Sequence, residues 1–298
     1  MRTLILTTLA MLAFAGNSLI CRLALSSGSI DPGSFTAIRI ISGAAMLALI
    51  LYVHRMKVEG NSLSALPLVI YAVCFSFAYL QLTAATGALL LFAAVQVTMI
   101  THGLLHGERL RGQRLLGFLL AAAGMIYLLL PGLSQPPLLS SLLMLTAGIA
   151  WGVYSLRGRG VANPLAATAG SFIYVAFPAF VWLLLQDFAT PGHGSASISI
   201  QGFGWAVLSG ALASGIGYLL WYAALRSLAS VTAAAVQLSV PPIAALGGVL
   251  LLGEVLTARL AISSAVILGG IALVVVQRKA AAGSGGDGGP LEDIGARV

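Results

Sequence analysis

Three amide side chains, Asn17, Gln96 and Gln237, stand in the middle of long apolar runs of this sequence. A polar group that is buried among apolar residues costs free energy unless a partner satisfies it. Gln96 and Gln237 fall near corresponding depths of two similar halves of the chain. The amides either bind a neighbouring membrane helix, for about 0.6–2 kcal/mol each, or bind a polar solute. Both interpretations stay open at this point.

The pair Pro241-Pro242 follows Gln237 closely. Proline donates no backbone hydrogen bond, so near the centre of a helix it would leave the carbonyl groups of Gln237 and Leu238 without partners. Such groups are tolerated in membrane helices where they face a cavity, and here they could hold an ammonium group. The alternative is a plain kink that lets the helix bend during gating, and the two interpretations are compatible.

Aromatic residues accompany these polar groups. Tyr79, Trp151 and Tyr218 are expected to line a cavity, and the glycines beside the last two either let helices approach closely or leave room for a solute. Trp221 and Tyr222 are expected to anchor the chain at the membrane surface. The predicted substrate-binding residues are Asn17, Tyr79, Gln96, Trp151, Tyr218 and Gln237, with Pro241 and Pro242 as a helix break used in gating.

The apolar runs contain no acidic residue near their centres, because Glu108 and Glu254 lie at corners and Asp187 at an end. Carriers of cations, and many proton-coupled carriers, use a buried carboxylate. Its absence favours a neutral or zwitterionic substrate and passive exchange, or coupling through another group. Arg39 could pair with a substrate carboxylate, but a structural arginine that extends to the membrane surface is the favoured interpretation.

His102, His106 and Glu108 have a spacing that resembles a metal site. They fall at the end of an apolar run, where a histidine-rich membrane interface is the simpler interpretation. We therefore expect no metal ion and no cofactor. His102 stays a candidate for a proton-linked gate, because it is the only titratable group close to the apolar core of its segment.

Composition indicates the elements that hold these residues. Hydrophobic residues make up 59% of the 298 residues and charged residues 8%, whereas soluble domains carry about 25% charged residues. We therefore expect an all-α integral membrane protein in a lipid bilayer. A span needs about 20 apolar residues, which predicts ten transmembrane helices near 3–25, 34–53, 64–80, 83–104, 113–130, 137–155, 164–185, 202–224, 230–252 and 258–277.

The distribution of basic residues predicts the orientation. The net charge of +7 comes without an aromatic-basic patch, so no nucleic-acid partner is expected. Only Arg22, Arg39 and Arg259 fall on one side of the predicted membrane, and cytoplasmic loops collect Lys and Arg. Both termini are therefore expected in the cytoplasm, on the side of Arg2, Arg55, Lys57, Arg109, Arg111, Arg114, Arg157, Arg159, Arg226, Arg278 and Lys279.

The first segment also resembles a cleavable signal peptide, with Arg2, an apolar stretch and then Ala13-Phe14-Ala15. Its apolar run continues to Leu25, which is long enough to span a membrane. Its removal would also destroy the internal symmetry of the chain. We therefore expect this segment to be retained as the first transmembrane helix.

The sequence repeats itself. Leu104–Leu110 recurs as Leu250–Leu256, each with a Gly-Glu pair, and the same offset places Gly124 on Gly270. This predicts two five-helix repeats, residues 1–132 and 133–279, followed by a disordered cytoplasmic tail, 280–298. Because five is odd, the repeats have opposite orientations, as in carriers that alternate access to a site between their halves.

The residues of the repeat resemble a known family. Gly-Glu-x-Leu between the fourth and fifth helices of each half, with Ala15-Gly16 and Trp151-Gly152 in their first helices, resembles the EamA-type proteins of the drug/metabolite transporter superfamily. Phe14–Ser18 and Phe92–Ile100 are most similar to its aromatic amino acid exporters, although Ala15 stands where the family often has Trp. The resemblance implies a bacterial inner-membrane exporter of amino acids, with helices around a central cavity.

The expected function is export of neutral amino acids, aromatic ones included, by a monomer with broad specificity. The alternative is efflux of another small metabolite or drug by the same fold. A membrane-embedded enzyme is disfavoured, because Gly-x-Ser-Gly, paired intramembrane aspartates and phosphate-binding loops are absent from the sequence. A scaffold or receptor is disfavoured too, because the longest internal loop, near residues 186–201, is too short for a soluble domain.

Overall fold

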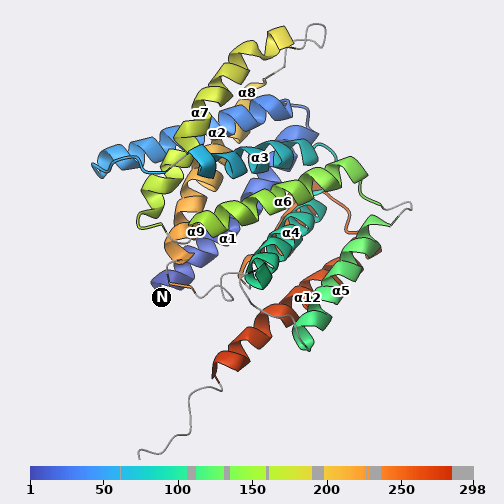
Figure 1. Ribbon diagram of the computed structural model, residues 1–298. Coiled ribbons are helices and arrows are strands. Elements are labelled where there is room, and N and C mark those ends of the chain that lie inside the picture. The colour runs from blue at the N-terminus through green and yellow to red at the C-terminus, as the bar shows by residue number, and fades with distance from the viewer. Residues whose placement is uncertain are drawn as a thin grey trace, which may run out of the picture.

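The computed structural model describes residues 1–60, 62–105, 112–130, 135–158, 161–189, 198–225, 227–228 and 236–283. The regular elements of this part of the chain are all helices (Figure 1). They are α1 Arg2–Ser26, α2 Pro32–Val53, α3 Ser62–Ala78, α4 Ala84–Leu105, α5 Gln113–Leu129, α6 Leu138–Gly158, α7 Pro164–Ala189, α8 Ile200–Leu208, η1 Ser209–Ile216, α9 Gly217–Leu225, α11 Val240–Leu252 and α12 Ala258–Gly283.

Six stretches of helix in the described residues are long and apolar enough to cross a membrane, and four shorter apolar helices accompany them. One of the six, Ile200–Leu225, is formed by α8, η1 and α9 in succession. Large apolar side chains such as Phe177 and Leu251 are exposed on the outside of the protein, where lipid rather than water solvates them favourably. The described residues therefore confirm the all-helical fold class and are consistent with a membrane protein, whereas ten membrane spans stay a prediction.

The second and seventh predicted segments begin as their sequences indicate. The side chain of Asp31 accepts a hydrogen bond from the backbone N–H of Ser34 at 2.9 Å, and Pro32 is the first residue of α2. Asn163 accepts one from the N–H of Ala166 at 3.3 Å, directly before Pro164 opens α7. Both ends use a capping side chain followed by a proline, which lacks the N–H that a first turn cannot use.

The eighth segment, expected as one regular helix, contains the π-helical stretch η1 between α8 and α9. Gly210 lies directly against the backbone oxygen of Arg39 and the hydroxyl of Ser42, so this stretch packs tightly on α2. In a π-helix the hydrogen bonds span five residues, so Ser209 and Ser214 come to one face. Such stretches within membrane helices are frequent at functional sites.

The ninth segment differs from the expectation. α11 begins at Val240, so Pro241 and Pro242 lie in the first turn of a helix and not at the centre of a long one. Val236 and Gln237 are helical, and Leu238 and Ser239 form a turn between them and α11. Proline is compatible with a first turn, because the N–H groups there have no partner within the helix. The helix is thus interrupted by a turn at Leu238-Ser239, and residues 229–235 lie outside the described part.

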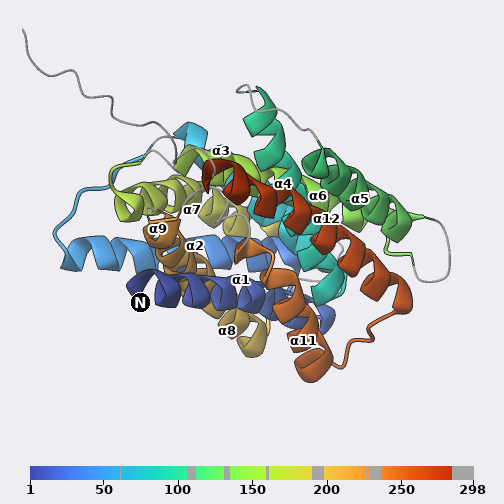
Figure 2. The ribbon, with the colours of Figure 1, turned by 90° about the horizontal axis from the view of Figure 1, so that it is seen from below.

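The helices form one bundle (Figures 1 and 2). α1 packs against α8, η1, α9 and α11, while α6 packs against α3 and α4, and α2 packs against α7 and η1. α5 and α12 lie side by side in both views and contact the remainder mainly where α12 meets α4. The middle of the bundle is therefore built from helices of both halves of the chain.

The C-terminal helix is longer than predicted. α12 continues to Gly283, past residue 280 where the disordered tail was expected to begin. Residues 280–282 are alanines, which have the highest helix propensity, so the helix continues until glycines follow. The rest of the predicted tail, residues 284–298, lies outside the described residues.

Candidate functional site

A small cavity lies inside the bundle, between α1, α3, α4, α6 and α9. Its volume is about 10 Å³, which is room for no more than one water molecule. An amino acid therefore fits only after the surrounding side chains move apart. We call the lining residues the central cluster: Phe14, Asn17, Ser18, Tyr71, Phe75, Leu91, Phe92, Trp151 and Tyr218.

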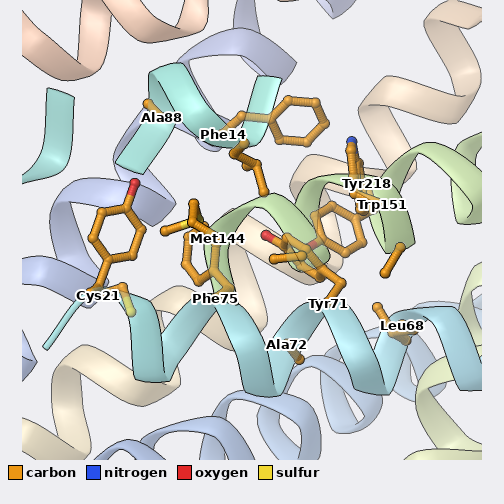
Figure 3. Close-up of a cluster of buried hydrophobic side chains, with 14 of the residues drawn as sticks. Phe14, Cys21, Leu68, Tyr71, Ala72, Phe75, Ala88, Met144, Trp151 and Tyr218 are labelled. Atoms are coloured by element: carbon orange, nitrogen blue, oxygen red, sulfur yellow. The ribbon is translucent and has the colours of Figure 1, made fainter. Parts of the chain in front are cut away.

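Aromatic rings form most of the wall of the central cluster. The rings of Trp151 and Tyr218 are 4.6 Å apart between centroids, and those of Tyr71 and Trp151 are 5.1 Å apart. The Phe14 ring packs edge-on against Trp151 at 5.5 Å. In Figure 3, Tyr71 and Phe75 extend from α3 toward the space bounded by Phe14 and Trp151. Edge-on and tilted contacts of this kind are favourable and leave apolar faces for a ligand.

Polar groups meet at one side of this wall. The hydroxyl of Tyr71 accepts a hydrogen bond from Asn17 Nδ2 at 3.3 Å and a second from Arg39 Nη2 at 3.1 Å. Ser209, in the π-helical stretch, donates to Asn17 Oδ1 at 2.6 Å. The two halves of the chain are thus connected by hydrogen bonds at the cavity.

Arg39 is a component of this site that the sequence-based site prediction missed. Its side chain is only 2% exposed, so it does not extend to the membrane surface as expected. Nε donates to Ser214 Oγ at 2.9 Å and Nη2 to the Tyr218 hydroxyl at 3.0 Å. The contact of α2 with Gly210 brings Arg39 within reach of these neutral hydroxyls. The one available signal was its position, about one and a half turns inside a predicted membrane helix.

The structure brings together three of the predicted site residues, Asn17, Trp151 and Tyr218. Tyr79 is buried beside Gly87, and its hydroxyl is 3.4 Å from the backbone oxygen of Ala84, outside the cavity lining. Gln96 and Gln237 are 1% and 0% exposed but do not line the cavity either. Substrate contact by these three residues stays a prediction, which requires a different arrangement of the helices.

Trp221 and Tyr222 are not membrane-surface anchors, contrary to the expectation. Both are buried, and the Trp221 ring packs against Phe14 at 5.8 Å between centroids. The Tyr222 hydroxyl is 3.4 Å from the backbone oxygen of Tyr154. Sequence position shows how deep a residue lies in a membrane helix but not which side of the helix faces the bundle, so this assignment failed.

A wider cavity of about 420 Å³ opens at one end of the bundle, near the C-terminal end of α6. Glu59, Arg157, Tyr154 and Tyr222 are among its lining residues. The rings of Tyr154 and Trp151 are 5.7 Å apart, so a layer of aromatic side chains separates this vestibule from the central cluster. The vestibule leads toward the central cluster but is closed from it.

The opposite end of the bundle is closed by Glu254. Gly253 has a positive φ of 64°, which ends α11 and turns the chain so that Glu254 lies against α4. The Glu254 carboxylate accepts hydrogen bonds from the backbone N–H of Ala84 at 2.8 Å and from Arg22 Nε at 3.2 Å. Arg22 also donates to the backbone oxygens of Tyr79 and Leu80. The Gly-Glu pair thus caps α4 and connects α1, α3 and α11.

The remaining candidate groups lie elsewhere. His102 is exposed in the last turn of α4. His106 and Glu108 fall outside the described residues, so their predicted positions stay predictions. Within the described ranges, no three His, Cys, Asp or Glu side chains come together in a way that would hold a metal ion.

Comparisons with known proteins give a consistent picture. The model of the EamA-like transporter family matches the chain twice, over residues 1–130 and 138–276. The uncharacterized protein PA1977 of Pseudomonas aeruginosa is 55% identical over 280 residues, 93% of this chain and 96% of that protein. The uncharacterized transporter YoaV of Bacillus subtilis is 22% identical over 254 residues, 81% and 86% of the two chains.

The fold also matches a protein solved by crystallography. The match has a TM-score of 0.62 and covers 91% of this chain and 99% of that one. The two sequences are 20% identical, so this likeness concerns the fold alone.

Proposed function

The chain belongs to the EamA-like transporter family and is therefore a multi-pass membrane transporter, and on that premise we propose that it exports neutral amino acids through the central cluster. The observation that carries the proposal is the combination of buried polar groups and aromatic rings at the cavity. Asn17, Tyr71 and Arg39 offer hydrogen bonds to the polar end of an amino acid. Trp151, Tyr218 and Phe14 offer apolar faces to its side chain.

The proposal includes two five-helix repeats of opposite orientation, residues 1–132 and 133–279. The two matches of the family model support the duplication. The helix contacts support a two-fold relation between the halves. In the proposed repeats, α1 corresponds to α6, α2 to α7, α3 to the succession α8–η1–α9, α4 to α11 and α5 to α12. The contact of α3 with α6 then corresponds to that of α1 with η1 and α9. The contact of α4 with α6 corresponds to that of α1 with α11. The pairs α2–α7, α4–α11 and α5–α12 each correspond to themselves.

Transport proceeds by alternating access in this proposal. The end closed by Glu254 and Arg22 is the outer one, because Arg22 and Arg259 belong to the side with few basic residues. The vestibule with Arg157 is then cytoplasmic, and both termini lie in the cytoplasm. In this proposal the structure corresponds to an occluded state, since the central cavity holds no more than one water molecule and a layer of aromatic side chains separates it from the vestibule.

Broad specificity follows from the wall of the cavity. An apolar pocket discriminates weakly between side chains, since one methylene changes the binding free energy by about 1–3 kcal/mol. Aromatic and aliphatic amino acids should both be accepted. Gln96, Gln237 and Tyr79 lie away from the occluded cavity, and we propose that they contact the substrate when the bundle opens.

The experiment is competition for transport in proteoliposomes that contain the full chain. Uptake of radiolabelled phenylalanine is measured against an excess of unlabelled amino acids, sugars or cationic drugs, with protein-free liposomes as the control. We expect inhibition by aromatic and aliphatic amino acids alone. Inhibition by a drug or sugar, and not by amino acids, would establish the alternative function of the same fold, efflux of another metabolite or drug.

A further inference from the structure

One nitrogen of Arg39 is unused. The guanidinium is buried on α2, and its Nε and Nη2 atoms donate to Ser214, Tyr71 and Tyr218. Nη1 is buried and has no hydrogen-bond partner among the described residues. Buried polar atoms are nearly always paired, so an unpaired donor on a buried cation indicates a partner that is not part of the protein.

The charge of Arg39 is also not neutralised. Its hydrogen-bond partners among the described residues are neutral hydroxyls, and its guanidinium carbon lies 5.2 Å and 5.0 Å from the ring centroids of Tyr71 and Phe75. In the part of the chain that the structure describes, the one ion pair is that of Arg22 with Glu254. Burial of an unpaired cation is costly, and hydroxyls and ring faces compensate less than a counter-ion does.

The surroundings of Arg39 have more donors than acceptors. The hydroxyl oxygen of Tyr71 already accepts from both Asn17 and Arg39, and that of Tyr218 accepts from Arg39, while Arg39 Nη1 is a donor with no acceptor among the described residues. A carboxylate would supply the missing hydrogen-bond acceptors, because it only accepts and its two oxygens match the spacing of the guanidinium N–H groups. An ammonium group would not, because it only donates and is repelled by Arg39.

Arg39 lies within one layer of side chains from the cavity. Tyr71 and Tyr218 line the cavity, and both bind Nη2 through their hydroxyls. A carboxylate that enters between these rings replaces their hydroxyl oxygens at Nη2 and occupies Nη1 at the same time. The two tyrosines therefore hold the guanidinium in place while the site is empty.

Resting on the proposed function, we propose that Arg39 is the carboxylate-binding residue of the carrier. The substrate class is then organic acids with a free carboxylate and an apolar or aromatic side chain, whether or not they carry an α-ammonium group. Amines and amino acid amides, which keep the side chain but lack the carboxylate, are excluded. This rule differs from one that requires the complete zwitterion.

Three compounds that share a side chain test this rule in proteoliposomes of the full chain: phenylalanine, phenylpyruvate and phenylalaninamide. Each competes with radiolabelled phenylalanine. We expect the two acids to compete at similar concentrations and the amide to need about 10- to 100-fold more, as for loss of a charge-assisted hydrogen-bond pair. An amide that competes as well as phenylalanine would overturn the proposal.

Variants of Arg39 connect this preference with the residue. Arg39→Gln should raise the concentrations needed for both acids by about 10- to 100-fold and leave that of the amide unchanged. Arg39→Lys keeps the charge but lacks the forked guanidinium, so the concentrations of the two acids that it needs should lie between those of the parent and of Arg39→Gln. The control is Arg259→Gln, which removes an arginine bound to the backbone oxygen of Leu130 and should behave as the parent. If Arg39→Gln keeps the parental preference for acids, Arg39 is not the carboxylate-binding group.

A binding measurement on the parent protein covers the case in which Arg39→Gln does not fold. Phenylpyruvate should raise the thermal unfolding temperature of the detergent-solubilised chain, and phenylalaninamide should not. The same measurement separates the two proposals. Protection by phenylpyruvate in a protein that transports no amino acid would support carboxylate binding by Arg39 and reject the proposed function. Equal transport of phenylalanine and its amide would support the proposed function and reject carboxylate binding by Arg39.

Discussion

The residues of the central cluster illustrate what sequence reasoning reaches at the scale of single side chains. Asn17, Trp151 and Tyr218 were predicted from their depth in apolar segments, and they meet at the cavity. Arg39 was misassigned, because its partners Tyr71, Ser214 and Tyr218 come from other helices. Depth in the membrane can be deduced from the sequence, but the direction of a side chain around its helix depends on packing.

Trp151→Ala should impair transport of large substrates more than of small ones. The indole contacts Tyr71, Tyr218 and Phe14, so its removal enlarges the cavity and removes an apolar face. We expect the concentration for half-maximal phenylalanine transport to rise by about 10-fold, the effect of about 1.4 kcal/mol, and that for threonine to change less. Gln237→Ala is the comparison, because loss of an amide contact to the zwitterion would weaken both substrates alike.

The two substrates are measured at matched expression of each variant in proteoliposomes. If both variants transport phenylalanine and threonine as the parent does, neither the aromatic wall nor the amide contributes to binding.

At the scale of elements, helix limits followed from the sequence where capping residues and prolines mark them, as at Asp31-Pro32. The π-helical stretch Ser209–Ile216 and the start of α11 at Val240 did not. The π-helical stretch packs closely on a distant helix, where Gly210 meets the backbone of Arg39. The Gly-Glu corner was recognised as a repeated pattern, and its role as a cap of α4 became evident only when Ala84 and Glu254 were seen together.

Glu254→Gln should loosen the closed end that we propose to be the outer one. Glutamine keeps the size of the side chain but loses the ion pair with Arg22 and the charge that caps α4. Cys21 is buried beside Arg22 and serves as a native reporter in a Cys74→Ser background. We expect its labelling by a membrane-impermeant maleimide to be about 10-fold faster in Glu254→Gln, since a charge-assisted hydrogen bond contributes about 1.5–3 kcal/mol.

The labelling control is Arg259→Gln, because the Arg259 side chain donates to the backbone oxygen of Leu130. Equal labelling rates in the parent and in Glu254→Gln would show that this corner does not close the outer end.

The α5–α12 pair offers a test of close helix packing with a built-in control. A methyl group on Gly270 would lie 2.6 Å from the backbone oxygen of Gly117, whereas one on the adjacent Gly269 would meet no atom within 4 Å. Gly270→Ala should therefore lower the free energy of unfolding by about 1–3 kcal/mol through overpacking. Gly269→Ala should be neutral or slightly stabilising, because alanine favours the helix.

Thermal unfolding of the detergent-solubilised variants measures this difference. A Gly270→Ala protein that unfolds at the same temperature as Gly269→Ala would mean that α5 and α12 are not packed this closely.

At the scale of the whole molecule, the low charge content and the long apolar runs were sufficient to predict an all-helical membrane protein. The family could be predicted from the Gly-Glu repeat, and the match over 1–130 and 138–276 bears it out. The substrate could not be predicted in the same way, since it depends on a few side chains whose arrangement no composition determines.

The inverted topology can be tested with single cysteines. One placed beside Glu108 and one beside Glu254 should be labelled from opposite faces of the membrane, because in the proposed arrangement five helices separate corresponding points of the two repeats. Impermeant reagents added to intact cells and to inverted vesicles measure this. Labelling of both positions from the same face would contradict the opposite orientation of the repeats.

Counterflow measures the central claim most directly. Proteoliposomes of the full chain are loaded with unlabelled leucine, equal pH is set on both sides, and radiolabelled phenylalanine is added outside. Because the described spans hold no acidic side chain near their centres, we predict transient accumulation of phenylalanine with no proton gradient, in the parent and in His102→Ala alike. Absence of accumulation above protein-free liposomes, or accumulation that requires an imposed proton gradient and disappears in His102→Ala, would contradict passive amino acid exchange through the central cluster.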